Sequence, residues 1–172
     1  MEQLSEVWSE VFASFEATPP LVAGVRLLIA AVLGGLIGFE REVNAQSAGL
    51  RTHILISMGA CMFALLSFEI VQLVQTDPSA QEVDPLVIIS AVTSGVAFLA
   101  AGSIIFSSGQ IKGLTTGAGM WMAGAIGLSC GIGKIGLALI ATLLVLAILW
   151  LLKGVKSQIV PNGSDERSSE ER

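Results

Sequence analysis

Two short charged segments in the first third of the chain hold most of the side chains that could do chemistry. The first comprises Glu40, Arg41 and Glu42, and the second is Arg51-Thr52-His53. Carboxylates, guanidinium groups, a hydroxyl and an imidazole within one turn could hold a cation, a phosphate or a charged segment of a partner protein. These six residues therefore form a candidate polar site.

A structural role for the same residues is an equal alternative. Glu40 is expected at the C-terminal end of a helix, where the helix dipole disfavours a carboxylate unless a cation compensates. Arg51 is the expected cation, in a bidentate pair that would clamp the turn. Thr52 is expected to cap the helix that follows. The sequence does not decide between a binding site and a charge clamp.

Three further polar residues join the candidate site. Asp84 precedes Pro85, a pair typical of a helix N-cap followed by proline at the first helical position. Thr115 and Thr116 fall at the expected start of a later helix, where free backbone amides could bind an anion or a carboxylate such as Glu40. The segment lacks the Lys-Ser/Thr ending of a phosphate-binding loop.

The chemistry that the sequence does not offer is equally informative. We find no nucleophile–base pair, no metal-ligand cluster and no nucleotide-binding motif, so the chain is predicted not to be an enzyme, and no catalytic residue is assigned. No cofactor is expected, with magnesium as the one candidate ligand and no assigned metal site. No basic patch suggests nucleic acid as a partner.

The elements that must position these residues are predicted to be membrane-spanning helices. Only 13% of the residues are charged and the mean hydropathy is +0.78, whereas soluble domains carry about a quarter charged residues. No Asp or Glu occurs from Pro85 to Ser164. An all-α, polytopic fold is predicted, with spans close to the roughly 20 residues that a bilayer requires. The five stretches are 21–39, 53–74, 85–106, 114–132 and 135–152.

The two ends of the chain are predicted to lie outside the bilayer core. Apolar residues of 1–16 follow helical spacing on one face, which predicts an amphipathic helix at the membrane interface. The polar C-terminal residues cannot form a core and are expected to be disordered. The predicted organisation is an N-terminal segment, 1–20, a transmembrane domain, 21–152, and a cytoplasmic tail, 153–172.

The basic residues predict the orientation. Seven of the nine Lys and Arg residues fall on one side of the five predicted spans, and only Arg26 and Lys134 fall on the other. Because short cytoplasmic loops carry the excess of basic residues, the N-terminus is expected outside and the C-terminus in the cytoplasm.

Small residues recur at helical spacing and predict close helix packing. In lipid, Gly and Ala let neighbouring backbones approach each other, so these faces also favour a homo-oligomer. The residues expected to pack helices are Gly34, Gly38, Gly95, Gly102, Gly113, Gly117 and Trp121.

Taken in order, the motifs resemble the MgtC/SapB family of bacterial inner-membrane proteins. The resemblance covers about residues 22–152, and the matching segments are Gly34 to Glu42, Ala48 to His53, Asp84-Pro85, Gly95 to Gly102 and Gly113 to Gly133. It implies a five-helix domain and a link to growth in low magnesium and to stress, including restraint of the proton-driven ATP synthase. The chain departs from the family pattern at Leu86-Val87-Ile88, where an arginine is usual.

Two functions follow as hypotheses. The first is a non-enzymatic regulator or accessory factor that acts on another membrane complex, such as the ATP synthase. The alternative is a magnesium transporter or channel subunit. Magnesium loses water reluctantly and is usually held by carboxylates, and the sequence places no Asp or Glu near the predicted membrane midplane. The regulator is therefore the favoured hypothesis.

Overall fold

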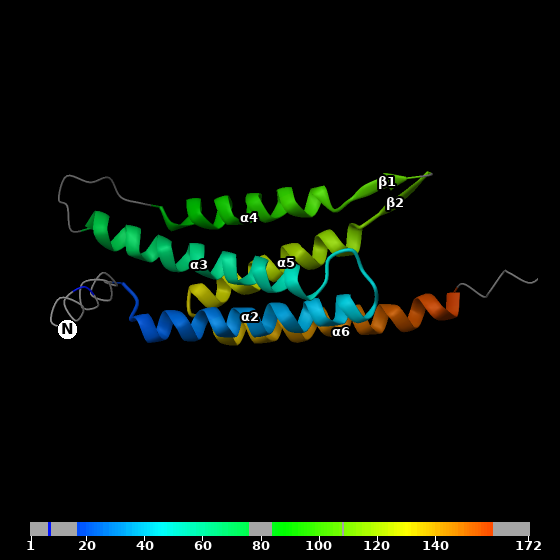
Figure 1. Cartoon of the computed structure of the whole chain (residues 1–172), viewed down its shortest axis with the longest axis horizontal. Helices are drawn as coiled ribbons and strands as arrows, with labels where there is room; N and C mark the ends of the chain where they lie inside the picture. The colour runs from blue at the N-terminus through cyan, green and yellow to red at the C-terminus, as the bar shows by residue number, and fades with distance from the viewer. Residues whose placement is uncertain (1–6, 8–16, 76–83, 108, 160–172) are drawn as a thin grey trace, which may run out of the picture.

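The computed structural model of the chain is a bundle of long helices, and it describes residues 7, 17–75, 84–107 and 109–159. Within these residues the helices are α2 (Pro20–Val43), α3 (Leu50–Gln75), α4 (Pro85–Gly102), α5 (Leu114–Gly131) and α6 (Ile135–Ile159). They run along one common axis (Figure 1). The predicted all-α, five-helix architecture is confirmed for this part of the chain, whereas the predicted helix at 1–16 lies outside the described residues apart from Val7.

Two of these helices are long and apolar enough to cross a membrane, Pro20–Val43 and Leu50–Val74. Leu86–Gly102 and Ile135–Leu151 are shorter apolar helical stretches. Large aliphatic side chains on these four helices face outward, as a hydrocarbon medium allows and water does not. The chain is therefore a membrane protein.

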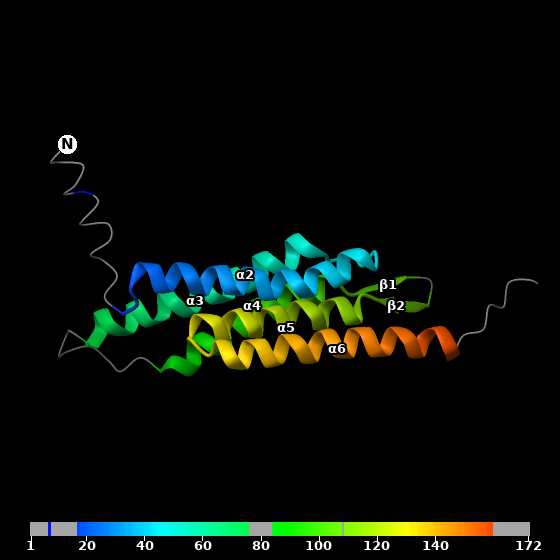
Figure 2. The ribbon, with the colours of Figure 1, turned by 90° about the horizontal axis from the view of Figure 1, so that it is seen from below.

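Helix α5 lies at the centre of the bundle and packs against each of the other four helices (Figure 2). Its glycines make this possible, because a Cβ on Gly127 would overlap the Ser57 carbonyl oxygen and one on Gly131 would lie 2.6 Å from the Cys61 carbonyl oxygen. Two glycines of α2 likewise allow α2 to approach α3 closely. A Cβ on Gly34 would lie 2.6 Å from the Ser57 Cβ, and one on Gly38 would lie 2.8 Å from the Leu50 Cα.

Each end of the α2–α3 pair is closed by a carboxylate on a helix N-terminus. Glu69, near the end of α3, accepts hydrogen bonds from the backbone N–H groups of Ala17 and Thr18 at 3.1 and 3.0 Å, just before α2 begins. Glu42, near the end of α2, accepts one from the N–H of Leu50 at 2.9 Å, where α3 begins. The Leu50 N–H belongs to the first turn of α3, whose amides lack partners within the helix. The Ala17 and Thr18 N–H groups precede Pro19, the N-cap of α2, and negative charge close to a helix N-terminus is also stabilising.

Arg26 binds a backbone carbonyl at the C-terminal end of a helix. Its Nη1 donates to the carbonyl oxygen of Gly131 at 2.9 Å, where α5 ends. Gly133, with φ of +84°, then turns the chain toward α6, and a Cβ there would lie 2.8 Å from the Arg26 guanidinium. A cation at a helix C-terminus is favourable, so the one charged side chain in the first half of α2 has a structural partner.

A short antiparallel ribbon connects α4 to α5 and was not predicted. It consists of β1 (Ile105–Ser107) and β2 (Gln110–Lys112). The prediction that a helix continues to Phe106 is wrong, because the Oγ of Ser103 and its N–H both bond the Ala100 carbonyl and end α4 at Gly102. Ile and Phe residues then favour extended backbone.

Other helix boundaries also differ from the predictions. Helix α2 continues past residue 39 to Val43, and α3 begins at Leu50 rather than His53 because Glu42 caps it there. Helix α6 continues to Ile159 rather than 152, so the predicted disordered tail begins within a helix. The rest of that tail, 160–172, lies outside the described residues.

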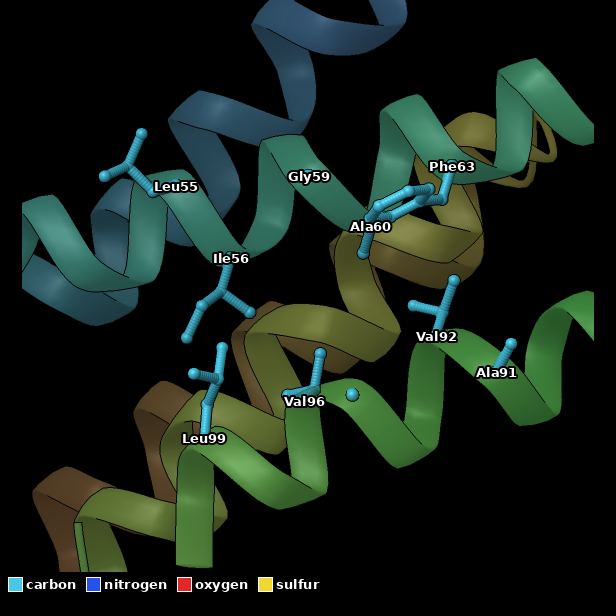
Figure 3. Close-up of a pocket in the computed structure, with 10 residues that line it drawn as sticks. Leu55, Ile56, Gly59, Ala60, Phe63, Ala91, Val92, Val96 and Leu99 are labelled. Carbon is cyan, nitrogen blue, oxygen red and sulfur yellow. The ribbon is translucent and has the colours of Figure 1, made fainter. Parts of the chain in front are cut away.

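An apolar groove of about 480 Å³ separates α3 from α4 (Figure 3). Ile56 and Phe63 of α3 and Val92, Val96 and Leu99 of α4 are among its lining residues. Two glycines, one from each helix, also line it, and a Cβ on either would meet no atom within 4 Å. These glycines are Gly59 and Gly95. The packing predicted for Gly95, and likewise for Gly102, is therefore not made inside the described chain.

A matched pair of glycines tests whether close backbone contacts at glycine stabilise the bundle. Gly127→Ala should lower the unfolding free energy by about 1–3 kcal/mol, since a forced overlap in a packed core costs that much. Gly59→Ala should leave stability unchanged or raise it, because its Cβ meets open space and Ala favours helix. Thermal unfolding in detergent measures both, and equal effects of the two substitutions would contradict the assigned contact.

Candidate functional site

The predicted charged segments meet at the α2–α3 turn and form a cluster of polar side chains with the start of α5. We call it the turn cluster, and it comprises Glu40, Arg41, Glu42, Asn44, Gln46, Ser47, His53 and Thr116. It lies at one end of the bundle, the same end as the ribbon (Figure 1).

Arg41 is the buried cation of the turn cluster. The residue is only 5% exposed, and it continues the buried face of α2 that runs through Ala30, Gly34 and Ile37. Its Nη2 donates to Oε1 of Gln46 at 2.8 Å. The carbonyl oxygen of Arg41 also accepts from the Gln46 N–H at 3.0 Å. Arg41 and Gln46 are therefore joined through both main chain and side chain, which closes the turn.

Glu40 pairs with its own turn rather than with Arg51. Asn44 Nδ2 donates to Oε1 of Glu40 at 2.6 Å and to its carbonyl oxygen at 2.7 Å. The other oxygen, Oε2, lies 3.8 Å from Nη1 of Arg41. The predicted Glu40–Arg51 clamp is wrong, since among the described residues Arg41 makes the ion pair and Arg51 is exposed.

The cap on α3 also differs from the prediction. Thr52 lies inside the helix, and the Glu42 carboxylate is the group that accepts from Leu50. Gly49 permits this contact, because a Cβ there would overlap the Glu42 carboxylate. The cap thus needs a glycine on one side of the turn and an acid on the other.

His53 is fully buried, with 0% exposure, between α2 and α5. Its Nδ1 lies 2.9 Å from the Gly49 carbonyl oxygen. A carbonyl can only accept, so Nδ1 carries the proton of this bond. A Cβ on Gly38 would lie 3.0 Å from the His53 Cβ, and one on Gly119 would lie 3.2 Å from Nε2. Glycines on both neighbouring helices therefore make the space that the imidazole occupies.

Three buried atoms of the turn cluster have no hydrogen-bond partner among the described residues: Glu40 Oε2, Arg41 Nε and His53 Nε2. Native proteins leave few such atoms unsatisfied. The guanidinium supplies a donor and the carboxylate an acceptor, so a small molecule that both donates and accepts, such as water, suits the pair. A bare cation suits it poorly, because Arg41 already supplies positive charge there.

Only part of the predicted site comes together. Thr116 is 2% exposed and its Oγ1 lies 3.4 Å from the Ser47 hydroxyl, whereas Thr115 is exposed. Asp84 caps α4 through a 2.8 Å bond from the Leu86 N–H, as predicted, but it lies at the opposite end of the bundle. Trp121 is 45% exposed and lines a groove between α4 and α5 instead.

The remaining glycines of the prediction act at α5. A Cβ on Gly117 would lie 3.2 Å from the Ala100 carbonyl oxygen, so α4 and α5 approach closely there. Gly113 has φ of +90°, and a Cβ there would overlap the Ser103 carbonyl. Both positions thus fix how α5 begins beside the end of α4.

Sequence reasoning missed the amides and the hydroxyl of the turn cluster. Asn44 lies four residues after Glu40, a spacing at which helical side chains meet. Arg41 falls seven residues after Gly34 on the small-residue face, which was a signal that it, and not Glu40, points inward. Nothing local in the sequence indicates the contact of Ser47 with α5.

Known proteins align with most of the length of this chain. A family model described as the MgtC family matches residues 27–158, which include the whole turn cluster. The chain belongs to the MgtC family. This confirms the resemblance drawn from the motifs. No solved structure matches the chain.

Three relatives illustrate the match of this MgtC family member. "Protein MgtC" of Brucella abortus (strain 2308) is 42% identical over 123 residues, 71% of this chain and 48% of that protein. "Protein MgtC" of Salmonella typhimurium (strain LT2) is 37% identical over 135 residues, 78% and 54% of the two chains. "Putative magnesium transporter YhiD" of Escherichia coli (strain K12) is 37% identical over 126 residues, 73% and 58%. The chain spans about half the length of these relatives.

Two arginines distinguish the observed cluster from the predicted clamp. Arg41→Ala should lower the unfolding free energy by about 1–3 kcal/mol, because it removes a buried hydrogen bond and leaves partners unsatisfied. Arg51→Ala should change it by less than about 0.5 kcal/mol, as for most surface positions. Denaturation in detergent measures both, and a loss from Arg51→Ala as large as that from Arg41→Ala would restore the Glu40–Arg51 clamp.

The Glu42 cap on α3 gives a further prediction. Glu42→Ala should cost about 0.5–2 kcal/mol, the usual loss for an N-cap acceptor, and should speed amide exchange at the start of α3. Glu42→Gln keeps an acceptor oxygen and should cost less. Hydrogen exchange with mass spectrometry reads the peptide that begins at Leu50. Unchanged exchange in Glu42→Ala would show that another group caps the helix.

Proposed function

We propose that this MgtC family member is a multi-pass protein of the bacterial inner membrane whose five helices all span the bilayer. Helices α4 and α6 contribute apolar stretches, and α5, which is richer in glycine, packs against each of the other four helices. The turn cluster and Lys112 then face the cytoplasm, with the N-terminus outside and the C-terminus inside, in keeping with the excess of basic residues on that side.

We infer that the chain acts as a non-enzymatic regulator in magnesium homeostasis or stress adaptation, by contact with another membrane complex such as the ATP synthase. The observation that carries this proposal is the use of charged side chains at helix ends. Arg26, Glu42 and Glu69 each bond the backbone at the end of a helix. All three side chains therefore act at helix ends, and none of them lines a path for an ion along the bundle axis.

Two buried hydroxyl groups nearer the middle of the bundle also donate to backbone carbonyls. The Ser57 hydroxyl donates to the Ala30 carbonyl at 2.8 Å, and the Thr142 hydroxyl donates to the Ala138 carbonyl at 2.8 Å. In the described residues, no three His, Cys, Asp or Glu side chains come together as metal ligands. Magnesium prefers carboxylates and water in an octahedral shell, so a path through one copy has little support.

A magnesium transporter or channel subunit is the second candidate, and the name of the Escherichia coli relative favours it. Such a path would run between copies or between this chain and a partner. The open glycines Gly59 and Gly95 on the α3–α4 groove support contact with a further helix, and a homo-oligomer is part of the proposal.

Reconstitution separates the two functions. Liposomes that contain the purified chain and a magnesium-sensitive dye should give no flux above empty vesicles. Liposomes that also contain the ATP synthase should lose ATP synthesis as the amount of this chain rises, whereas an equal mass of an unrelated membrane protein should not reduce it. Magnesium entry that scales with protein, together with unchanged ATP synthesis, would overturn the regulator and establish transport.

A further inference from the structure

The ribbon between α4 and α5 exposes large apolar side chains. Ile105, Phe106 and Ile111 are 60%, 73% and 58% exposed, and every residue of both strands is exposed. An isolated two-stranded hairpin is marginally stable in water, and exposed aliphatic and aromatic groups favour an apolar medium. Contact of one face with an apolar surface would therefore stabilise the ribbon.

The two faces of the ribbon differ in chemistry. Phe106 pairs with Ile111 across the strands, so both side chains lie on one face. Ser107, Gln110 and Lys112 alternate with them and lie on the other face, beside Ile105. The ribbon is thus amphipathic, with one wholly apolar cross-strand pair and an opposite face that carries polar groups and a cation.

The helices that flank the ribbon place it at the edge of the bilayer core. Helices α4 and α5 have 18 residues each, about 27 Å at 1.5 Å per residue, slightly less than a hydrocarbon core of about 30 Å. Helices α2, α3 and α6 have 24, 26 and 25 residues. The ribbon follows the last residue of α4 and precedes the first residue of α5. If these two helices span the hydrocarbon core, the ribbon starts at the boundary between acyl chains and headgroups.

The charge of the ribbon itself suits one kind of surface. Lys112 is the only charged residue between Asp84 and Lys134. No carboxylate on the ribbon competes for it or repels an anion. A lysine at the membrane boundary is attracted to anionic headgroups, while the apolar pair fits the acyl chains beneath them.

We propose that the ribbon is a lipid anchor that binds the anionic headgroup surface of the leaflet at its end of the bundle. Phe106 and Ile111 insert at the top of the acyl chains, and Lys112 pairs with a lipid phosphate. The anchor fixes how α4 and α5 sit in that leaflet. This inference rests on the five-span arrangement proposed above, and its test is designed to fail separately from it.

The test places an environment-sensitive fluorophore on single cysteines of the full chain in nanodiscs of phosphatidylcholine, with or without phosphatidylglycerol. Ile111→Cys reports the apolar face and Gln110→Cys, its neighbour on the other face, is the matched control. Leu143→Cys, 66% exposed midway along the apolar part of α6, reports the bilayer core. Cys61 and Cys130 are buried, and the unsubstituted chain gives the labelling background.

The anchor predicts that nitroxide lipids quench the Ile111 label more than iodide does, and that the order reverses for Gln110. Phosphatidylglycerol should strengthen lipid quenching at Ile111. Lys112→Gln should weaken the preference for phosphatidylglycerol about fivefold, as expected for one lysine at the surface, and Lys112→Arg should preserve it.

Two results would overturn the anchor. One is iodide quenching at Ile111 with no lipid quenching in either nanodisc. The other is protection of Ile111 only in nanodiscs that hold two copies, which would assign the ribbon to a protein contact. A label at Leu143 that escapes quenching by nitroxides deep in the acyl region would instead refute the span by α6, so the two failures are distinct.

Discussion

Backbone amides and carbonyls at helix ends need partners when water is scarce, and this requirement organises the few charged side chains of the bundle. Glu69 serves the start of α2, Glu42 the start of α3, and Arg26 the end of α5. Each contact joins residues of different helices or turns. The ionic groups therefore set the registers of the helices, and the interior between them can remain apolar and tightly packed.

Close helix contacts explain the position of the turn cluster. Gly34 and Gly38 bring α2 against α3, and Gly127 and Gly131 bring α5 against the same helix. The imidazole of His53 occupies the narrow space that remains near the turn. As a result the cluster is closed on its inner side by α5, and its three unpartnered atoms are themselves buried rather than exposed in an open cleft. An arrangement of this kind suits a fixed surface better than a carrier site.

The sequence predicted five helices because each is a long, predominantly apolar stretch, which is what a bilayer requires of a spanning segment. It failed where a contact joins distant residues. Glu42 caps Leu50 across the turn, so α3 begins earlier than its apolar run suggests. Arg41 lies on the buried face of α2 and makes the ion pair with Glu40, whereas Arg51 is exposed. The ribbon was missed because Ile104 to Phe106 is as apolar as the helix before it, and Ser103 ends that helix by a local hydrogen bond.

Both carboxylates at the α2–α3 turn are engaged within the chain, Glu42 with the Leu50 N–H and Glu40 with Asn44 and Arg41, and we expect neither to bind magnesium. Thermal unfolding of the purified chain during a magnesium titration, at constant ionic strength, tests it directly. A ligand that binds only the folded state raises the unfolding temperature in a saturable way. We predict no such rise. A saturable increase that disappears in both Glu40→Gln and Glu42→Gln, but persists in Arg51→Ala, would show instead that these carboxylates bind magnesium.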